Sequence, residues 1–466
     1  MNTLAHDHVK SLDPKTIQLG ELGPRLMGIG LLLGLAGLGV AGYTALHFGG
    51  DDPGMLKDHF FHAYLVAFMF YLGITLGAIF FVMLHHLARA GWSVTVRRIA
   101  EGFAGNIWLM AILFIPVLRG MHHMYEWMDS SVTDPASKNY DKLIAGKSFF
   151  LSPTHYLAFF AAYFAIWIGL STYFRNRSAQ QDITGDPKLS LWMTRLAAPC
   201  MMLFAFSATG MWFHLLMSLN AHWFSTMWGV YLFAGSVLTF FSVLTLTCLY
   251  LQKMGKLKSV ITKEHYHDLG KFAFAFTFFW GYVAFSQYML IWYANLPEET
   301  QFYFPRELGR WLVVSIVLIF CHLLIPFAGL LSRHAKRGLS IFAFWAIWLL
   351  FAELLNLFWI VMPAMFSNKI PGWVAEGHQG APKLPLPEAL HSFLSNQDIY
   401  QPLSNYADKM DSINYAFTAA PMVITVSLVI GLGGLYLAST AFMLRGKPLL
   451  ATRDPKLPEA LAFENI

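Results

Sequence analysis

The chain alternates between long apolar runs and short polar segments. A helix needs ~20 mostly apolar residues to cross the hydrocarbon core of a membrane, and about ten runs reach that length. The pattern therefore predicts an all-α integral membrane protein with about ten transmembrane helices. The first run is expected to stay as a helix, because no small-residue cleavage site follows it. The runs cover residues 25–48, 60–84, 99–118, 149–174, 191–218, 223–251, 272–294, 309–331, 340–366 and 415–444.

Composition argues against a soluble enzyme. Of the 466 residues, 56% are hydrophobic and 13% are charged, whereas a soluble protein carries roughly 25% charged residues. The three cysteines, Cys200, Cys248 and Cys321, lie inside apolar runs and form no C-x-x-C or Cys/His zinc spacing. We therefore expect no covalently bound cofactor and no metal site, so that any redox centre is held non-covalently or belongs to a partner.

Lysine and arginine concentrate in every second loop, and short cytoplasmic loops are the ones enriched in them. The loops between are poorer in these residues, and two of them, 49–53 and 295–299, are acidic. The alternation predicts that both termini are cytoplasmic, and it explains the net charge of +5 without a nucleic-acid partner. The basic set is Lys10, Lys15, Arg25, Arg89, Arg97, Arg98, Arg175, Arg177, Lys188, Lys253, Lys256, Lys258, Lys263, Arg333, Lys336, Arg337, Arg445, Lys447, Arg453 and Lys456.

An internal repeat predicts how the helices are grouped. His62, Tyr71-Leu72 and Phe80-Phe81 recur 160 residues later as His222, Tyr231-Leu232 and Phe240-Phe241. Both segments run inward from the outer face, which is typical of parallel repeats. We predict four-helix bundles at 59–218 and 219–366. The remaining parts are a cytoplasmic tail at 1–24, a flanking helix and outer loop at 25–58, a periplasmic loop at 367–414, a flanking helix at 415–444 and a cytoplasmic tail at 445–466.

Ionisable residues inside the spans are candidates for function, because they are costly in lipid and usually face the bundle interior. Glu353 lies near the middle of its span with Asn356 on the same helix face, and His322 lies well inside the preceding span. With the inner-side residues they suggest a proton path, although ion pairing and snorkelling at helix ends are the ordinary alternative. The path candidates are Glu353, His322, Glu101, Asp268, Lys271 and Arg195. The outer-side residues are Asp58, His59, His62, His155, His214 and Arg310.

Other patterns are better explained by packing. Gly37-x-Gly39-x-x-Gly42 matches a dinucleotide-binding fingerprint, but it lies inside a membrane span with no strand before it. Close helix contact explains it, as it explains Gly30-x-x-x-Gly34 and Gly73-x-x-x-Gly77. The pairs His59/His62 and His122/His123 could suggest a metal or haem site, but no matched ligand set lies at one depth.

Three segments resemble a known family. They are EHYHDLGKFAFAFTFFWGYVAFSQYMLIWYANLPEET at 264–300, HWFSTMWGVYLFAGS at 222–236 and AGWSVTVRRIAEG at 90–102. They resemble the membrane subunits of alternative complex III, a quinol:cytochrome c oxidoreductase, within the polysulphide-reductase C-type (NrfD-like) superfamily. Of the two such subunits, the chain resembles the F type. The family fold is two four-helix bundles with flanking helices.

The resemblance implies a multi-pass subunit of a respiratory complex in the bacterial inner membrane that oxidises menaquinol. Partner subunits would carry the redox centres: an iron–sulfur subunit, multihaem and monohaem cytochromes c, a second NrfD-like subunit and a terminal oxidase as acceptor. A quinol pocket in this subunit would lie near Asp58, His62 and His214. Two alternatives remain: a secondary transporter, since parallel repeats also serve transport, and a b-type cytochrome with His322, His214 or His62 as axial ligands.

Overall fold

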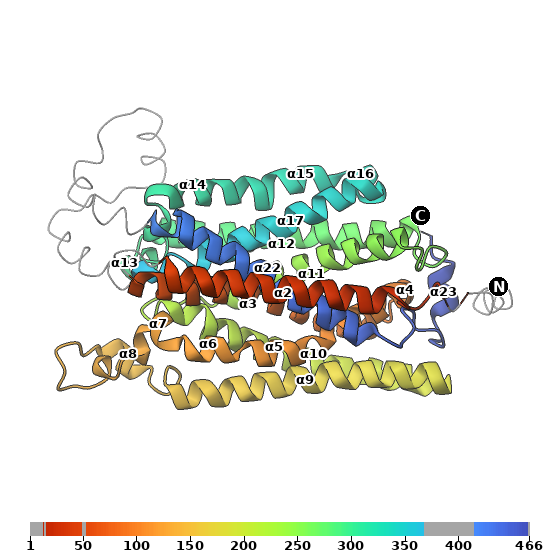
Figure 1. Cartoon of the computed structure of the whole chain (residues 1–466), viewed down its shortest axis with the longest axis horizontal. Coiled ribbons are helices and arrows are strands. Elements are labelled where there is room, and N and C mark those ends of the chain that lie inside the picture. Colours follow the sequence, from red (N-terminus) through yellow and green to blue (C-terminus); the bar gives the residue numbers. More distant parts are fainter. Residues whose placement is uncertain (1–12, 14, 49–52, 368–413, 465–466) are drawn as a thin grey trace.

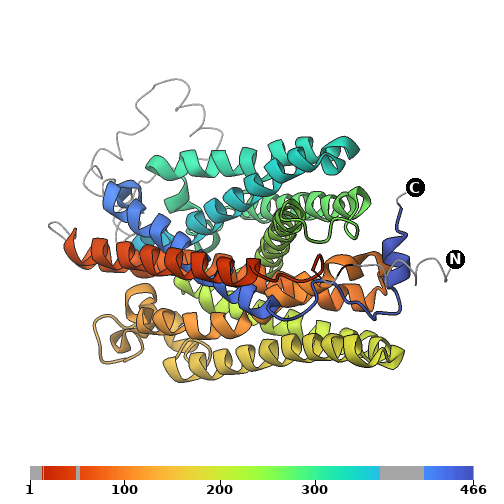
Figure 2. The ribbon, with the colours of Figure 1, turned by 45° about the vertical axis from the view of Figure 1, so that its right-hand side comes forward.

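The computed structural model describes residues 13, 15–48, 53–367 and 414–464. Within these residues it is helical, with no β-strand. It contains ten helices, some of them interrupted, that are long and apolar enough to cross a membrane. The predicted all-α, ten-span architecture is therefore confirmed for the described part of the chain. Figures 1 and 2 show these helices packed along a common long axis.

The membrane-length segments follow one another in an up-and-down order. Three of them, the third, the eighth and the ninth, contain more than one α-helix. They are α2 (Leu22–His47), α3 (Pro53–Leu87), α4–α6 (Val94–Gly105, Ile107–Leu113, Ile115–Arg119), α9 (Pro153–Thr184), α10 (Pro187–Leu215), α11 (Trp228–Lys253), α12 (Lys263–Ala294), α14–α15 (Gly309–Leu318, Ile325–Leu331, joined by a π-helical segment at Ile319–Leu324), α17–α18 (Leu339–Val361, Ala364–Ser367) and α22 (Ala419–Leu444). Short helices in the connections are α7 (Met121–Met124), α8 (Lys142–Gly146), α13 (Pro297–Thr300) and α16 (Arg333–Arg337), and the short helix α23 (Leu457–Leu461) follows the last membrane-length segment.

Several helices run past the apolar stretches that predicted them. The helix α9 extends to Thr184 and α10 begins at Pro187, so that only two residues join them. Gly185 has φ +68°, a left-handed conformation that glycine adopts without steric cost. Asp186 then caps α10 by accepting a hydrogen bond from the backbone N–H of Lys188. These polar ends carry no hydrophobic signal, which is why apolar length alone understates the helices.

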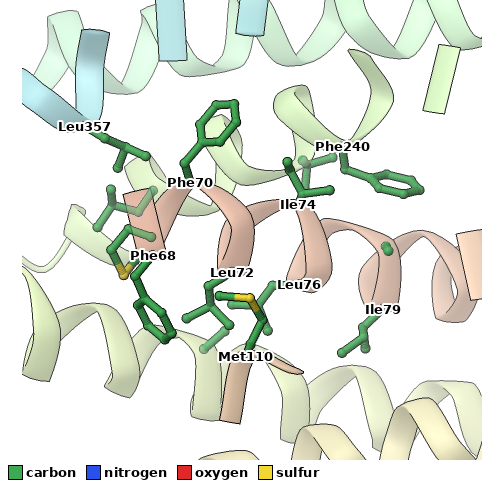
Figure 3. Packing of buried hydrophobic residues seen from close by; sticks show 14 of the residues in the cluster. Phe68, Phe70, Leu72, Ile74, Leu76, Ile79, Met110, Phe240 and Leu357 are labelled. Carbon is green, nitrogen blue, oxygen red and sulfur yellow. The ribbon is translucent and has the colours of Figure 1, made fainter. Parts of the chain in front are cut away.

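The helices group into two sets around a shared centre. The helices α3, α4, α9 and α10 pack together, and α11 packs with α12 and α17, which in turn contacts α14. The two sets meet where α3 lies against α11 and α17. Figure 3 shows this centre: Phe70 and Ile74 of α3 point towards the side of Leu357 of α17 and Phe240 of α11, whereas Phe68 and Leu76 point to the other side of α3, where Leu76 lies near Met110. The flanking helices α2 and α22 pack closely on each other, and α22 also contacts α3. These contacts agree with the predicted arrangement of two four-helix bundles with flanking helices.

The basic loops gather at one end of the molecule, which we call the basic end. It carries α4, α16 and α23, whereas α7, α8 and α13 lie at the other end, which we call the opposite end (Figure 1). The first and last described segments also meet at the basic end, where Leu449 donates a backbone hydrogen bond of 2.6 Å to the carbonyl of Ile17. The side of the membrane that each end faces stays a prediction.

The residues of the proposed repeat do not all occupy equivalent places. His62 lies inside α3, but His222 lies in the connection before α11, where its Nε2 is 2.6 Å from Oδ2 of Asp141. Both Phe80-Phe81 and Phe240-Phe241 lie within the two central helices. The repeat itself stays a prediction. The predicted periplasmic loop at 367–414 falls, apart from its end residues, outside the described part of the chain.

Candidate functional site

Glu353 and His322 meet in the interior of the second bundle. The Nε2 of His322 lies 2.9 Å from Oε2 of Glu353, and the two side chains are 0% and 4% exposed. Glu353 belongs to α17, and His322 lies in the π-helical segment between α14 and α15. The two most central candidates from the sequence are therefore partners, although 31 residues separate them along the chain.

The local helix geometry and a stacked indole together fix the imidazole of His322. The chain around it forms a π-helical turn, Ile319–Leu324, a rare feature that is frequent at functional sites. The indole of Trp280 in α12 stacks on the imidazole, with the ring centroids 3.6 Å apart and the planes at 24°. The imidazole is thus held between an aromatic face and a carboxylate, which limits its rotation.

A glycine of α11 makes room for the carboxylate. A Cβ atom at Gly235 would lie 2.5 Å from Oε1 of Glu353, which is too close for any larger residue without a shift of the carboxylate. A small cavity adjoins Glu353, and Ser236 and Thr239 are among its other lining residues. Its size suits about one water molecule. The carboxylate therefore has both a fixed partner and space for water.

Asn356 and Tyr231 extend the site along α17. The side-chain amide of Asn356 donates to Oε2 of Glu353 over 3.3 Å. The hydroxyl of Tyr231 in turn donates to Oδ1 of Asn356. A carboxylate with these donors can accept a proton or release one without leaving a bare charge in a dry interior. The arrangement is thus capable of holding and moving a proton, which is the chemistry predicted for Glu353 and His322.

The inner-side candidates lie at the basic end in three separate places. Glu101 belongs to a buried ion network in which Arg98 Nη1 is 2.9 Å from Glu101 Oε2, and Arg98 also pairs with Asp182. Asp268 pairs with Lys271 within the first turns of α12. Arg195 is exposed and lies over the ring of Trp192. Among the described residues no contact joins these groups to Glu353, so a continuous inner path stays a prediction.

The outer-side candidates lie at the opposite end of the first bundle, except Arg310, which lies in the first turn of α14 in the second bundle. The Nδ1 of His123 is 2.8 Å from Oδ1 of Asp58, and His62 Nδ1 is 2.8 Å from the backbone carbonyl of Asp58. His214 is stacked on Phe150, with the centroids 3.8 Å apart, and its Nδ1 is 3.2 Å from the Tyr163 hydroxyl. The histidines His59 and His155 bond to Pro421 and Ser152, respectively.

The predicted quinol-binding residues do not form an open pocket as they are packed. His62 and His214 each have a buried Nε2 without a hydrogen-bond partner, which could in principle bond to a quinol hydroxyl. However, their side chains are covered, at 1% and 0% exposure, and an aromatic ring lies directly on His214. A head group does not fit there without movement of these rings, so we derive no step through quinol in this chain.

The most informative residue that the sequence did not single out is Arg306. It lies in the connection before α14 and is buried against the rings of Phe302 and Trp359, 3.6 and 4.9 Å from their centroids. Its guanidinium donates to the backbone carbonyls of Trp359 (3.1 Å), Ile360 (2.6 Å) and Phe302. Burial lowers the pKa of Arg306 to about 9, so the group remains charged at neutral pH.

No family model matches this chain, and no curated protein matches it. The fold and the site define a class nonetheless. The chain is a multi-span helical membrane protein with a carboxylate–imidazole pair buried inside its second bundle. In the described part of the chain, no group of three or more His, Cys, Asp and Glu side chains is placed to hold a metal ion.

Proposed function

We propose that this chain is an integral membrane subunit of a quinol-oxidising respiratory complex, and that it contributes assembly and proton transfer. The observation that carries the proposal is the buried pair of Glu353 and His322. Ionisable groups at such depth are costly, and in membrane proteins they mark proton relays and similar paths. The resemblance of residues 264–300 to subunits of alternative complex III supplies the type of complex.

In this proposal the chain moves protons while partner subunits move electrons. The carboxyl group of Glu353 takes up a proton, and the imidazole of His322 compensates the change of charge because it lies within hydrogen-bond distance. Trp280 and Gly235 act as positioning residues for the two groups. The iron–sulfur clusters, the c-type haems and the menaquinol chemistry belong to the partners in this scheme.

Copurification tests the proposal. The chain is tagged and extracted in mild detergent from its native membrane. It should copurify with iron–sulfur and multihaem cytochrome c subunits in fixed ratio, and the preparation should show a c-type haem spectrum. Isolation of the chain alone, with an uptake activity of its own in liposomes, would contradict the proposal and favour a transporter. A haem b spectrum in the separated chain would favour the cytochrome alternative.

A further inference from the structure

A file of polar side chains leads from Glu353 towards the opposite end. Asn356 lies one turn beyond Glu353 on α17 and bonds to it over 3.3 Å. Tyr231, on the neighbouring helix α11, donates its hydroxyl hydrogen to Asn356. Tyr231 also interacts electrostatically with Glu353, Tyr303 and Arg306. It is therefore the group that connects the buried pair to the connection before α14.

Arg306 forms the middle of this file. Its bonds to the carbonyls of Trp359 and Ile360 place the guanidinium about one turn beyond Asn356 along α17. The guanidinium interacts with both Tyr303 and Tyr231, and its partners in the described structure are carbonyls and rings rather than a carboxylate. A fixed positive charge at this position stabilises a transient negative charge on either phenol oxygen and opposes the passage of other cations.

Glu307 ends the file at the opposite end of the bundle. The ring of Tyr288 on α12 packs edge-on to that of Tyr303, with the centroids 5.0 Å apart, and Glu307 lies near both tyrosines. The side-chain amide of Gln287 lies 3.5 Å from the Tyr303 hydroxyl. Burial raises the pKa of Glu307 to about 7. A carboxyl group with that pKa is half protonated near neutral pH.

The basic side of Glu353 offers no comparable file within the described residues. The carboxylate borders the small cavity with Ser236 and Thr239, and each of those hydroxyls donates to a backbone carbonyl of its own helix. Along α12, Asp268 lies twelve positions before Trp280, which corresponds to about 18 Å of helix. Phe272 and Phe276 lie in that interval and pack on Phe241 of α11.

We propose that Glu353 exchanges protons with the opposite end of the bundle through Tyr231 and Tyr303, with Glu307 as the last proton acceptor and Arg306 as a positioning residue. This inference rests on the proposed proton-transfer role of Glu353. Each phenol relays by accepting a proton on its oxygen while it gives up its own hydrogen, so neither phenol gains or loses a proton overall, and Glu307 accepts one proton for each proton that leaves Glu353. The proposal places a water molecule at each step where the side chains are not in direct contact. The groups that face Glu353 are His322 and Tyr231, and those that face Glu307 are Tyr288 and Tyr303.

The test follows the protonation of Glu353 directly. The full chain, with the partners that copurify, is placed in oriented lipid vesicles, and the pH is stepped on one side at a time. The infrared C=O band of the protonated carboxyl reports the exchange, and the band lost in Glu353→Gln assigns it. We expect the Glu353 band to follow the pH at the opposite end. Glu307→Gln and Tyr303→Phe should each slow this exchange on the order of 100-fold.

The matched control is Glu298→Gln, since Glu298 is an exposed carboxylate near the same end. It should leave the exchange rate unchanged, and circular dichroism should show all variants folded. The proposal is overturned if Glu353 follows the pH at the basic end, if it does not titrate, or if Glu307→Gln and Tyr303→Phe both exchange at the wild-type rate. The infrared readout does not depend on electron transfer, so failure of the respiratory assignment would appear in copurification and not here.

Discussion

At the scale of single residues, Glu353 and His322 stand out in the sequence because they interrupt apolar runs. Their pairing could not be predicted, since the contact joins two spans and depends on the rotation of each helix. Tyr231 and Arg306 were missed for a related reason. A tyrosine near a helix end is typical of the membrane interface, and an arginine in a short connection usually reaches water. Only the tertiary structure shows that both are buried.

Because Arg306 is buried and bonds to three carbonyls, its replacement should strongly lower the stability of the fold. Arg306→Met leaves the carbonyls of Trp359, Ile360 and Phe302 without their donor, and each unsatisfied buried group costs about 1–3 kcal/mol. We expect the free energy of unfolding in detergent to fall by several kcal/mol on that basis. Arg310→Met, at an exposed arginine four residues further on, should cost little. Equal losses in the two variants would show that the carbonyl contacts of Arg306 are unimportant.

The raised pKa of Glu307 predicts how the stability of the fold depends on pH. Its pKa is raised by burial to about 7 in the folded chain, against 4.5 for an ordinary glutamate. The folded state therefore binds this proton more tightly than the unfolded state does. The resulting stabilisation is complete below about pH 4.5 and is lost as the pH rises through about 7. Melting temperatures in detergent across this range should decline for the wild type and for Glu298→Gln, and the decline should be smaller in Glu307→Gln. If the melting temperature of Glu307→Gln declined with pH as steeply as that of the wild type, the raised pKa of Glu307 would be contradicted.

At the scale of helices, the count and most of the small-residue contacts were predictable because both depend on local sequence. The prediction of close helix contact is wrong for Gly39 and Gly42, where nothing lies within 4 Å of an added Cβ. A Cβ atom added at Gly73 would lie 3.1 Å from Oγ of Ser236, and one added at Gly77 would meet the side chain of Phe240. The motif Gly73-x-x-x-Gly77 therefore packs α3 on α11, as expected. The π-helical turn around His322 could not be predicted, because a π-helical turn within a membrane helix produces no recognisable pattern of apolar residues. Helix ends were also misplaced wherever a helix continues into polar residues.

The dinucleotide-like motif in α2 provides a matched pair of variants. A Cβ at Gly37 would lie 2.6 Å from the backbone of Gly431 and Ser427 in α22, whereas nothing lies within 4 Å of one at Gly39. Gly37→Ala should therefore force α2 and α22 apart and lower the melting temperature. Gly39→Ala should be neutral or slightly stabilising, by at most about 1 kcal/mol of helix propensity. Equal effects at the two positions would argue against helix packing as the role of this motif.

At the scale of the whole molecule, hydropathy and loop charge predicted the number of spans and the clustering of basic loops at one end. Such features are predictable because lipid imposes them on every span separately. The file from Glu353 to Glu307 was not predictable, because it is assembled from α11, α12, α17 and the connection before α14. Its members share no spacing in the sequence, and they meet only when the second bundle is packed.

The predicted orientation can be tested with single cysteines. Lys258→Cys lies in an exposed connection at the basic end, and Glu298→Cys is exposed at the opposite end. Because basic loops stay in the cytoplasm, a membrane-impermeant thiol reagent on intact spheroplasts should label Glu298→Cys and spare Lys258→Cys. Permeabilised membranes should allow both to be labelled. The reverse pattern in intact spheroplasts would invert the topology and would make the file from Glu353 lead to the cytoplasm.

The central claim is that the buried carboxyl group of Glu353 handles protons for the complex. Its most direct test is the ratio of protons moved to electrons transferred in the reconstituted complex that carries Glu353→Gln. Glutamine keeps the size of the side chain but cannot be protonated in this range, so the account predicts normal assembly with proton-coupled turnover lowered on the order of 100-fold. Glu298→Gln should behave as wild type. Wild-type proton movement in assembled Glu353→Gln would contradict the account.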